Sequence, residues 1–413
     1  MTATDVSTAI TRAHREEWAR VVAGLTRRFG DLDLAEEAAA EAFATAVARW
    51  PADGVPPNPG AWLTTTAVRT AIDRIRRESK RDGKHREAQV LYGDGPPEPP
   101  QPLGVIEDDR LRLVFTCCHP ALAMENRVAL TLRMVAGLSV PEIARAFLVQ
   151  EPAMGQRITR AKAKIKATRI PYRVPTAADL PSRVSGVLGV LFLVFNEGYL
   201  ATGPDSDPIR HDLTTEAIRL TRLVRALLPE DGEVAGLLAL MLLTEARSAA
   251  RVSSSGELVT LDEQDRGAWD AALVAEGHQL VRERLGTREA PGRYQILAAI
   301  NAVHTSARDV RDTDWSQVVA LYDQLVRLDP TPIVALNRAV AVAELDGPDV
   351  ALAAVDRLAD ALAGYHAFHA TRADLLRRLG RSGPARAAYD RAIELAGNTA
   401  ETAYLTRRRD QPG

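Results

Sequence analysis

The chain has 413 residues, a formal net charge of −2, 46% hydrophobic residues and 5% aromatic residues. This length suffices for two or three domains, and few aromatic side chains in a Leu- and Ala-rich chain favour packed helices over sheets. Two cysteines argue against a disulfide framework, the N-terminal residues lack a signal-peptide pattern, and no apolar run is long enough to span a bilayer. We therefore expect an all-α, cytoplasmic protein, and its near-neutral charge argues against strong DNA binding by the chain alone.

Residues 9–80 are expected to form a first helical unit, with helices at 14–29, 34–50 and 59–80. The second of these helices is amphipathic and acidic. Such a surface repels phosphate and suits a basic protein partner. Its carboxylates include Asp33, Glu36, Glu37 and Glu41.

The third expected helix carries a basic face. Val68, Ile72 and Ile75 recur at helical spacing and are predicted to face the core. Charged residues lie on the other side: Arg69, Asp73, Arg74, Arg76, Arg77 and Lys80. A basic stripe with Trp62 at one end suits single-stranded DNA, where bases stack on rings and cations follow phosphates. A core anchor is the alternative role for Trp62.

Residues 137–165 have the pattern of a helix-turn-helix. They end a second helical unit over 108–167, which a proline-rich extended linker at 94–103 separates from the first. Ser139 can cap the first helix while Glu142 reaches back in a capping box. In the second helix, Met154, Ile158, Ala161 and Ile165 form an apolar stripe, and Gln156, Arg157, Arg160 and Lys164 lie off it. These polar side chains can reach base edges and phosphates, so the segment is predicted to bind DNA.

Beyond residue 177 the chain remains helical and contains a repeat. Asp323, Asp356 and Asp390 occupy equivalent places in three similar segments, 33 and 34 residues apart. This spacing is close to the period of about 34 residues of tetratricopeptide helix pairs and predicts stacked helix pairs over 315–400. A chance repeat in an Ala-rich chain is the alternative.

The order of these motifs resembles a known family. An acidic helix beginning Asp33-Leu-Ala-Glu-Glu37 precedes the basic helix at 61–77, and the linker and the helix-turn-helix follow. Over residues 9–170 this order is similar to the extracytoplasmic-function (ECF) sigma factors of bacterial RNA polymerase. The tail, with Phe195-Asn-Glu-Gly-Tyr199 and the helical repeats, resembles the subgroup that carries a tetratricopeptide-like C-terminal extension.

The resemblance implies a dissociable initiation subunit that directs core RNA polymerase to promoter DNA. It places sigma region 2 at 1–82, a linker at 83–107, region 4 at 108–172 and the extension at 178–413. Polymerase would contact Asp33, Glu36, Glu37 and Glu41; the −10 element would contact Trp62, Arg69, Asp73, Arg74 and Arg77; the −35 element would contact Gln156, Arg157, Arg160, Lys162 and Lys164. Val68-Arg69 stands where the family often has Arg-Asn, which leaves the base preference there open.

The remaining polar motifs favour packing over chemistry. Cys117 and Cys118 cannot both face one metal from a regular helix, so we expect buried small hydrophobes. His366 and His369 lack carboxylates at metal-binding spacing. No phosphate-binding loop, nucleotide fingerprint or catalytic triad occurs, so neither a cofactor nor an enzymatic activity is expected. The motif at 195–199 either pins its helix or lines a ligand pocket.

The extension is interpreted as a built-in regulator or a further polymerase contact. In one alternative it senses a ligand or peptide that controls promoter choice. In another it is an enzyme fused to the transcription module, with Glu197, Asp265 and Arg266 as its polar centre. The expected partners are core RNA polymerase, promoter DNA, and a regulatory protein or ligand at the extension, with no membrane.

Overall fold

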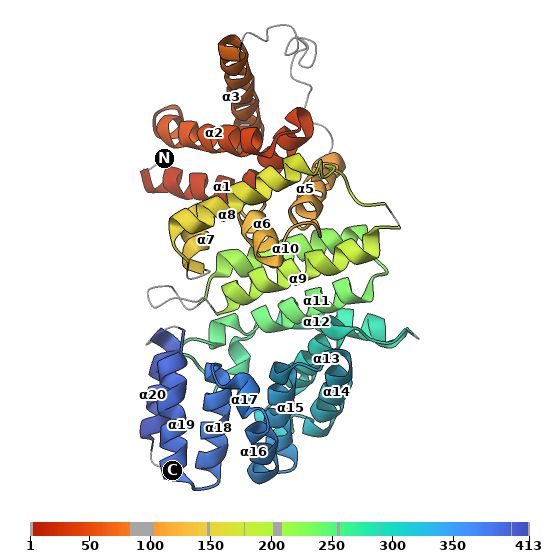
Figure 1. The fold of residues 1–413 in the computed structure, drawn as a ribbon, viewed down its shortest axis with the longest axis vertical. Helices are drawn as coiled ribbons and strands as arrows, with labels where there is room; N and C mark the ends of the chain where they lie inside the picture. The colour runs from red at the N-terminus through yellow and green to blue at the C-terminus, as the bar shows by residue number, and fades with distance from the viewer. Residues whose placement is uncertain are drawn as a thin grey trace. The chain divides into compact units, whose positions relative to one another are not determined.

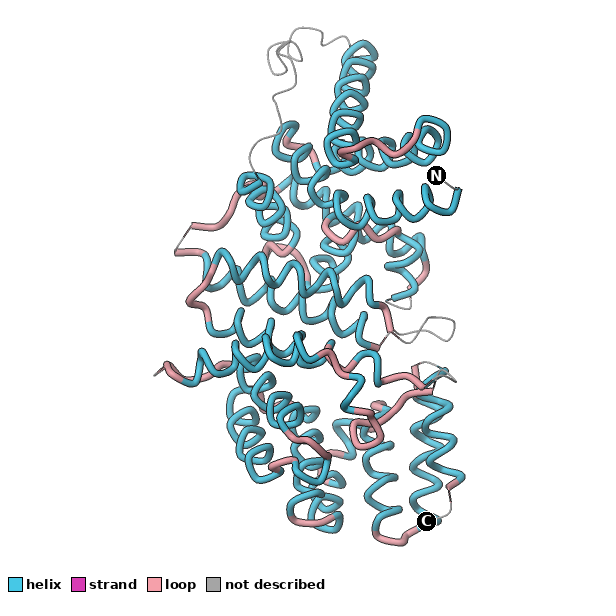
Figure 2. The backbone as a smooth tube through the Cα atoms, turned by 180° about the vertical axis from the view of Figure 1, so that it is seen from behind, coloured by secondary structure: helices cyan, strands magenta, loops and turns pink. Residues whose placement is uncertain are grey.

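The computed structural model describes residues 3–82, 103–146, 149–176, 178–200, 209–253, 257–287, 289–397 and 399–411. The fold in these ranges is helical, as predicted (Figures 1 and 2), and an isolated bridge between Val252 and Leu258 is the one piece of β-pairing they contain. None of the described helices is both long and apolar enough to cross a membrane. The chain forms two compact units, residues 1–193 and 194–413.

The first unit begins with three helices: α1 (Ala3–Phe29), α2 (Leu32–Asp53) and α3 (Pro59–Asp82). Gly30 ends α1 with a φ of 68°, a left-handed conformation that glycine adopts without strain. Asp31 then caps α2 by accepting hydrogen bonds from the backbone amides of Asp33 and Leu34. Between α1 and α2, the rings of Trp18 and Phe43 pack with their centroids 5.8 Å apart.

Four helices follow in the same unit: α5 (Leu103–Cys117), α6 (Met124–Met134), α7 (Val140–Ala146) and α8 (Glu151–Ala167). α5 begins at Leu103, inside the segment predicted as linker, and the remainder of that predicted linker, 83–102, lies outside the described residues. α1 contacts α5, where Arg27 and Asp109 form an ion pair of 3.1 Å. The two helical groups of this unit are therefore packed together.

Helix α9 (Leu180–Tyr199) runs across the boundary between the units. Its apolar stretch is largely buried. Near its start, Arg183 donates a hydrogen bond from Nη2 to the carbonyl oxygen of Phe115 at 2.7 Å. The first part of α9 thus completes the packing around α5.

The second unit is built around α11 (Gly232–Glu245), whose residues Val234–Thr244 are all buried. A helix that is apolar on all sides belongs in a core. It packs against α10 (His211–Leu227), α12 (Ala271–Leu285) and α13 (Arg293–Ser306). At Gly236, an added Cβ would lie 2.5 Å from the backbone nitrogen of Gln295, so only glycine permits this approach to α13.

The rest of the second unit consists of consecutive packed helices. They are α14 (Trp315–Leu328), α15 (Pro332–Leu345), α16 (Pro348–Asp356), α17 (Ala359–Leu362), α18 (His366–Arg378), α19 (Ser382–Leu395) and α20 (Thr399–Asp410). Short 3-10 turns, Ser248–Ala250, Arg266–Ala268 and Val310–Asp312, connect earlier helices.

The three aspartates of the sequence repeat have the same role in these helices. Each accepts a hydrogen bond from an arginine on a later helix of the stack: Asp323 from Arg338 at 2.6 Å, Asp356 from Arg372 at 2.7 Å, and Asp390 from Arg409 at 2.9 Å. The pairs join α14 to α15, α16 to α18 and α19 to α20. The repeat in the sequence therefore corresponds to a repeated ion pair between packed helices.

Candidate nucleic-acid interface

Helices α7 and α8 form the predicted helix-turn-helix. The capping box is present, since the amide and hydroxyl of Ser139 donate to Oε2 of Glu142 at 2.7 and 2.6 Å, and the Glu142 amide donates to Oγ of Ser139 at 3.4 Å. The four residues of the predicted apolar stripe on α8 are all buried: Met154, Ile158, Ala161 and Ile165. These contacts fix the orientation of α8 and decide which of its side chains are exposed.

One face of α8 presents a group of polar side chains. Gln156, Arg160 and Lys164 are exposed at intervals of four residues, and Arg157 is half-buried beside them. Nη2 of Arg160 donates to Oε1 of Gln156 at 3.3 Å. Guanidinium, amide and ammonium groups in one row on an exposed helix have the chemistry needed to contact base edges and phosphates in a major groove.

Lys162 lies apart from the other predicted −35 residues. Its side chain is only 11% exposed, and its Nζ lies 2.5 Å from Oδ1 of Asp33 and 2.8 Å from Oε2 of Glu36. Lys166, one turn further along α8, pairs with Asp31 at 3.0 Å. The sequence assigned Lys162 to DNA and Asp33 and Glu36 to polymerase, whereas the structure pairs them with one another.

Glu36 is the centre of this pairing. Besides Lys162 it accepts a hydrogen bond from Nε of Arg133 on α6 at 2.5 Å. Burial raises the pKa of Glu36, but the charges of Arg133 and Lys162 outweigh burial and hold this pKa below its usual value. Burial likewise lowers the pKa of Lys162, and Asp33 and Glu36 outweigh it. We call the ion pairs of Asp31, Asp33 and Glu36 with Lys162 and Lys166 the α2–α8 contact.

The other two predicted polymerase-binding residues, Glu37 and Glu41, are exposed on α2. Glu37 forms an ion pair with Arg74 of α3, and Arg74 also binds Glu78 at 3.1 Å. The four predicted acidic residues therefore divide into two pairs. Asp33 and Glu36 belong to the α2–α8 contact, while Glu37 and Glu41 lie at the surface near α3.

The buried face of helix α3 differs from the predicted one. Its fully buried residues are Leu63, Ala67 and Ala71, whereas Val68, Ile72 and Ile75, predicted to face the core, are only half-buried. The two small alanines allow α3 to approach its neighbours closely, and this moves the core face by one position.

The charged side of α3 remains exposed. Arg69, Asp73 and Arg77 are exposed, and Nε of Arg77 donates to the carbonyl oxygen of Asp73 at 3.3 Å. Trp62 is half-buried, and its ring meets the buried Trp50 ring edge-on at 5.5 Å. Trp62 thus has both an anchoring contact and an exposed part.

The two cysteines are buried, as predicted. Burial raises the pKa of the Cys118 thiol to about 11 and that of Cys117 well above its usual value. Within the described residues, no group of three or more His, Cys, Asp or Glu side chains is placed to hold a metal ion.

The polar motifs of the second unit mainly serve local structure. Asp265 caps a 3-10 turn by accepting from the amide of Gly267, and Arg266 donates to the carbonyl oxygens of His304 and Ala307. His366 pairs with Glu401 at 3.1 Å. Arg247 and Arg251 belong to none of the motifs found in the sequence, and only the structure shows that both side chains are buried.

Comparison with known protein families matches three segments of the chain. Residues 14–81 match sigma-70 region 2, residues 112–165 match sigma-70 region 4, and residues 183–285 match a family of unknown function, DUF6596. The first two matches cover the helices that carry the exposed cations and carboxylates described above.

Two curated proteins are similar over long stretches. Uncharacterized protein R00370 of Rhizobium meliloti is 44% identical over 398 residues, which is 94% of this chain and 92% of that protein. A probable ECF RNA polymerase sigma factor, SigI of Mycobacterium tuberculosis, is 29% identical over 203 residues, which is 47% of this chain and 68% of that protein. No solved structure matches the chain.

Proposed function

Because this chain belongs to the ECF-type sigma factors with a C-terminal extension, we propose that it directs core RNA polymerase to a subset of promoters and is regulated through that extension. Sigma factors are initiation factors and not enzymes, so bond formation is left to the polymerase. The observation that carries the proposal is the exposed row Gln156, Arg160 and Lys164 on a helix whose opposite side is fixed by packing.

The exposed face of α8 is proposed to contact the −35 element. An amide such as that of Gln156 pairs with adenine, and a guanidinium such as that of Arg160 pairs with guanine, in the major groove. Lys164 and Arg157 are suited to phosphates, which position the helix without specifying sequence. Lys162 is not included in this group, because its ammonium is engaged with α2.

Arg160→Ala tests this assignment. One base contact of this kind is worth about 1–3 kcal/mol of discrimination, so initiation from preferred promoters should fall by about 5- to 150-fold. Run-off transcription with core polymerase over a promoter library measures the change, using the full chain. Arg386→Ala, an exposed arginine on α19, is the matched control and should have no effect. A loss of polymerase binding in Arg160→Ala would contradict the assignment.

The exposed side of α3 is proposed to hold the −10 element as a single strand. Arg69 and Arg77 would follow phosphates, while Asp73 and the exposed part of Trp62 would contact bases. Arg74 belongs to the same helix but is held by Glu37 and Glu78. Unstacking each base costs a few kcal/mol, so bound polymerase must contribute to melting.

The acidic side of α2 is proposed to bind polymerase. Glu37 and Glu41 are accessible to a basic partner. Asp33 is also exposed, but its carboxylate is engaged by Lys162, and Glu36 is buried and bound by both Lys162 and Arg133. Charge reversal at Glu37 and Glu41 should lower polymerase affinity and leave promoter preference unchanged. Pull-down with core polymerase, together with the promoter library, separates these two effects.

A second candidate function concerns the extension itself, which could sense a ligand. The observation that favours it is a cavity within the second unit, lined by two buried arginines. In this alternative, the occupied cavity would change promoter output by the coupling that such sites supply, about 1–3 kcal/mol.

A further inference from the structure

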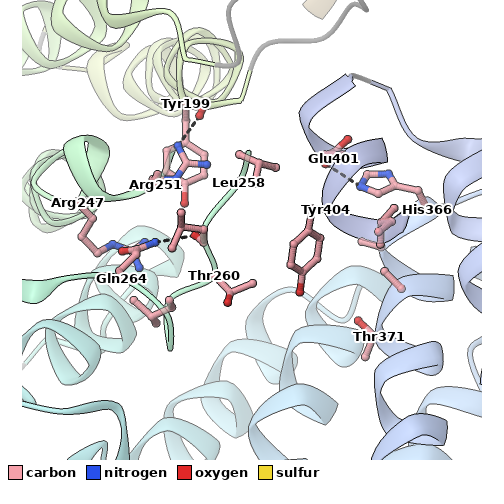
Figure 3. A pocket seen from close by; sticks show the side chains of 15 residues that line it. Tyr199, Arg247, Arg251, Leu258, Thr260, Gln264, His366, Thr371, Glu401 and Tyr404 are labelled. Atoms are coloured by element: carbon pink, nitrogen blue, oxygen red, sulfur yellow. Dashed lines mark hydrogen bonds and ion pairs between the residues drawn. The ribbon is translucent and has the colours of Figure 1, made fainter. Parts of the chain in front are cut away.

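A cavity of about 340 Å³ lies within the second unit (Figure 3). Its lining comes from the end of α9, from the segment between α11 and α12, and from α18 and α20. Figure 3 shows Arg247, Arg251 and Gln264 grouped on one side, and His366, Glu401 and Tyr404 on the other. A volume of this size is within the range of cavities that hold small molecules.

Two arginines of the lining are buried and have no carboxylate partner among the described residues. Arg247 and Arg251 are only 8% and 6% exposed. No ion pair within 4.0 Å joins either of them to a carboxylate in the described ranges, and Nε of Arg247 has no hydrogen-bond partner there. A buried cation without compensation costs free energy, which a negatively charged ligand would recover.

The charge of Arg251 is opposed by its surroundings. Burial lowers the pKa of Arg251, and the adjacent charge of Arg247 lowers it further. Arg251 is held in place, because its Nη1 donates to the carbonyl oxygen of Tyr199 at 2.5 Å and its guanidinium lies 3.3 Å from the Tyr199 ring centroid. Glu245, the nearby carboxylate on α11, pairs with His211 at 3.2 Å. Arg251 is therefore held in position, and no carboxylate of the described residues forms an ion pair with it.

The same cavity has an apolar part and one carboxylate. Leu258, Leu261 and Leu405 are among its lining residues. Glu401 is the single acidic residue of the described lining, and it is paired with His366 at 3.1 Å. The buried Oε1 atom of Gln264 also lacks a hydrogen-bond partner within the described part of the chain. The cavity thus offers cations, an unpaired amide oxygen and an apolar wall.

We propose that this cavity binds a small organic acid, with its anionic group at Arg247 and Arg251 and its apolar body against the leucines. The site includes Tyr199 of the motif at 195–199, which promoter recognition does not use, and Gln264. Binding itself is independent of transcription, whereas an effect on promoter output would rest on the proposed sigma function. The anion would supply a counter-charge that no ion pair of the described residues gives to Arg247 and Arg251.

Thermal unfolding of the full chain tests the binding with defined probes. Hexanoate, its neutral analogue hexanol, and inorganic phosphate are added separately. Hexanoate should raise Tm by about 2–3 °C at ten times its Kd, and hexanol should not. A rise with phosphate equal to that with hexanoate would overturn the role of the apolar wall. No rise with either anion would overturn the site.

Variants of Arg247 locate the effect. Arg247→Met should raise the Tm of the chain without added anion, because an uncompensated buried charge is replaced by an apolar side chain, and it should abolish the response to hexanoate. Arg247→Lys keeps the charge without the planar fork and should retain a weaker response. The control, Arg282→Met, changes an exposed arginine on α12 outside the cavity and should leave the response intact.

A full hexanoate response in Arg247→Met, or a lowered Tm of that variant without anion, would overturn the proposal. Because these measurements need no polymerase, their failure is distinct from a failure of the chain to initiate transcription. Run-off transcription with and without hexanoate then asks separately whether the occupied cavity controls promoter output.

Discussion

His304 is a partly buried histidine whose charged neighbours are cations. Burial, and then the charges of Arg247 and Arg266, lower its pKa from 6.5 to about 4. A base with a lowered folded pKa takes up a proton more readily when the chain is unfolded. Its contribution to stability is therefore complete above pH 6.5 and is lost as the pH falls from 6.5 towards 4, by about 3 kcal/mol in all.

Thermal unfolding between pH 7 and pH 4 measures this loss. His304→Gln removes the titrating ring and should flatten the pH dependence of Tm over this interval. His369→Gln, on α18, is the control, since its Nε2 lies 2.8 Å from the carbonyl oxygen of Ala363 and it is not among the residues that line the cavity with Arg247. An unchanged pH slope in His304→Gln would assign the dependence to other residues.

At the scale of single residues, contacts between sequence neighbours could be predicted and contacts between distant residues could not. The capping box of Ser139 and Glu142 was predictable, because the two residues are three apart and share one helix end. The pairing of Glu36 was not, because Arg133 and Lys162 follow it by 97 and 126 residues. Periodicity identifies Glu36 as a charge on an amphipathic helix but carries no information about distant partners.

Among the helices, the packing of α11 on α13 depends on one small residue. Gly236→Ala would place a Cβ 2.5 Å from backbone that cannot move as a side chain does. We expect a loss of about 1–3 kcal/mol in the free energy of unfolding, typical of overpacking. Denaturant unfolding of the full chain measures it.

Gly383, near the start of α19, is the control for this substitution. An added Cβ there meets nothing within 4 Å. Gly383→Ala should therefore stabilise the chain by about 0.5 kcal/mol, through helix propensity and a less flexible unfolded state. Equal destabilisation by both substitutions would mean that the contact with Gln295 is not the cause.

The helices themselves were largely predictable, whereas their core faces were less so. The stripe on α8 was correct because bulky side chains define it. On α3 the buried positions Ala67 and Ala71 are small, and the larger Val68 and Ile72 beside them shifted the predicted face. The aspartate repeat indicated stacked helices, but only the structure reveals that each aspartate binds an arginine such as Arg338.

For the molecule as a whole, the α2–α8 contact limits what a partner of α2 can reach. Lys162→Ala removes the ammonium from Asp33 and Glu36. If polymerase binds these carboxylates, as proposed, its affinity should rise by the free energy that held them, about 1 kcal/mol or fivefold. Equilibrium binding of the full chain to core polymerase measures this.

Lys164→Ala, two residues along the same helix, is the matched control. Its side chain belongs to the exposed face, so this variant should weaken promoter binding and leave polymerase affinity unchanged. A fall in polymerase affinity for Lys162→Ala would mean that Lys162 contributes to the polymerase surface directly. The two parts of this contact come from segments that sequence patterns treat as separate domains, so their pairing was not predictable.

Because Cys117 and Cys118 are buried, the reactivity of their thiols can report when the first unit opens. These are the only two thiols of the chain, and both are withheld from solvent with raised pKa values. Alkylating reagents need an accessible thiolate, so labelling of the native chain should be slow and should accelerate only when α5 and its neighbours separate. Because the two native thiols react slowly, a cysteine introduced elsewhere can be labelled selectively with a dye.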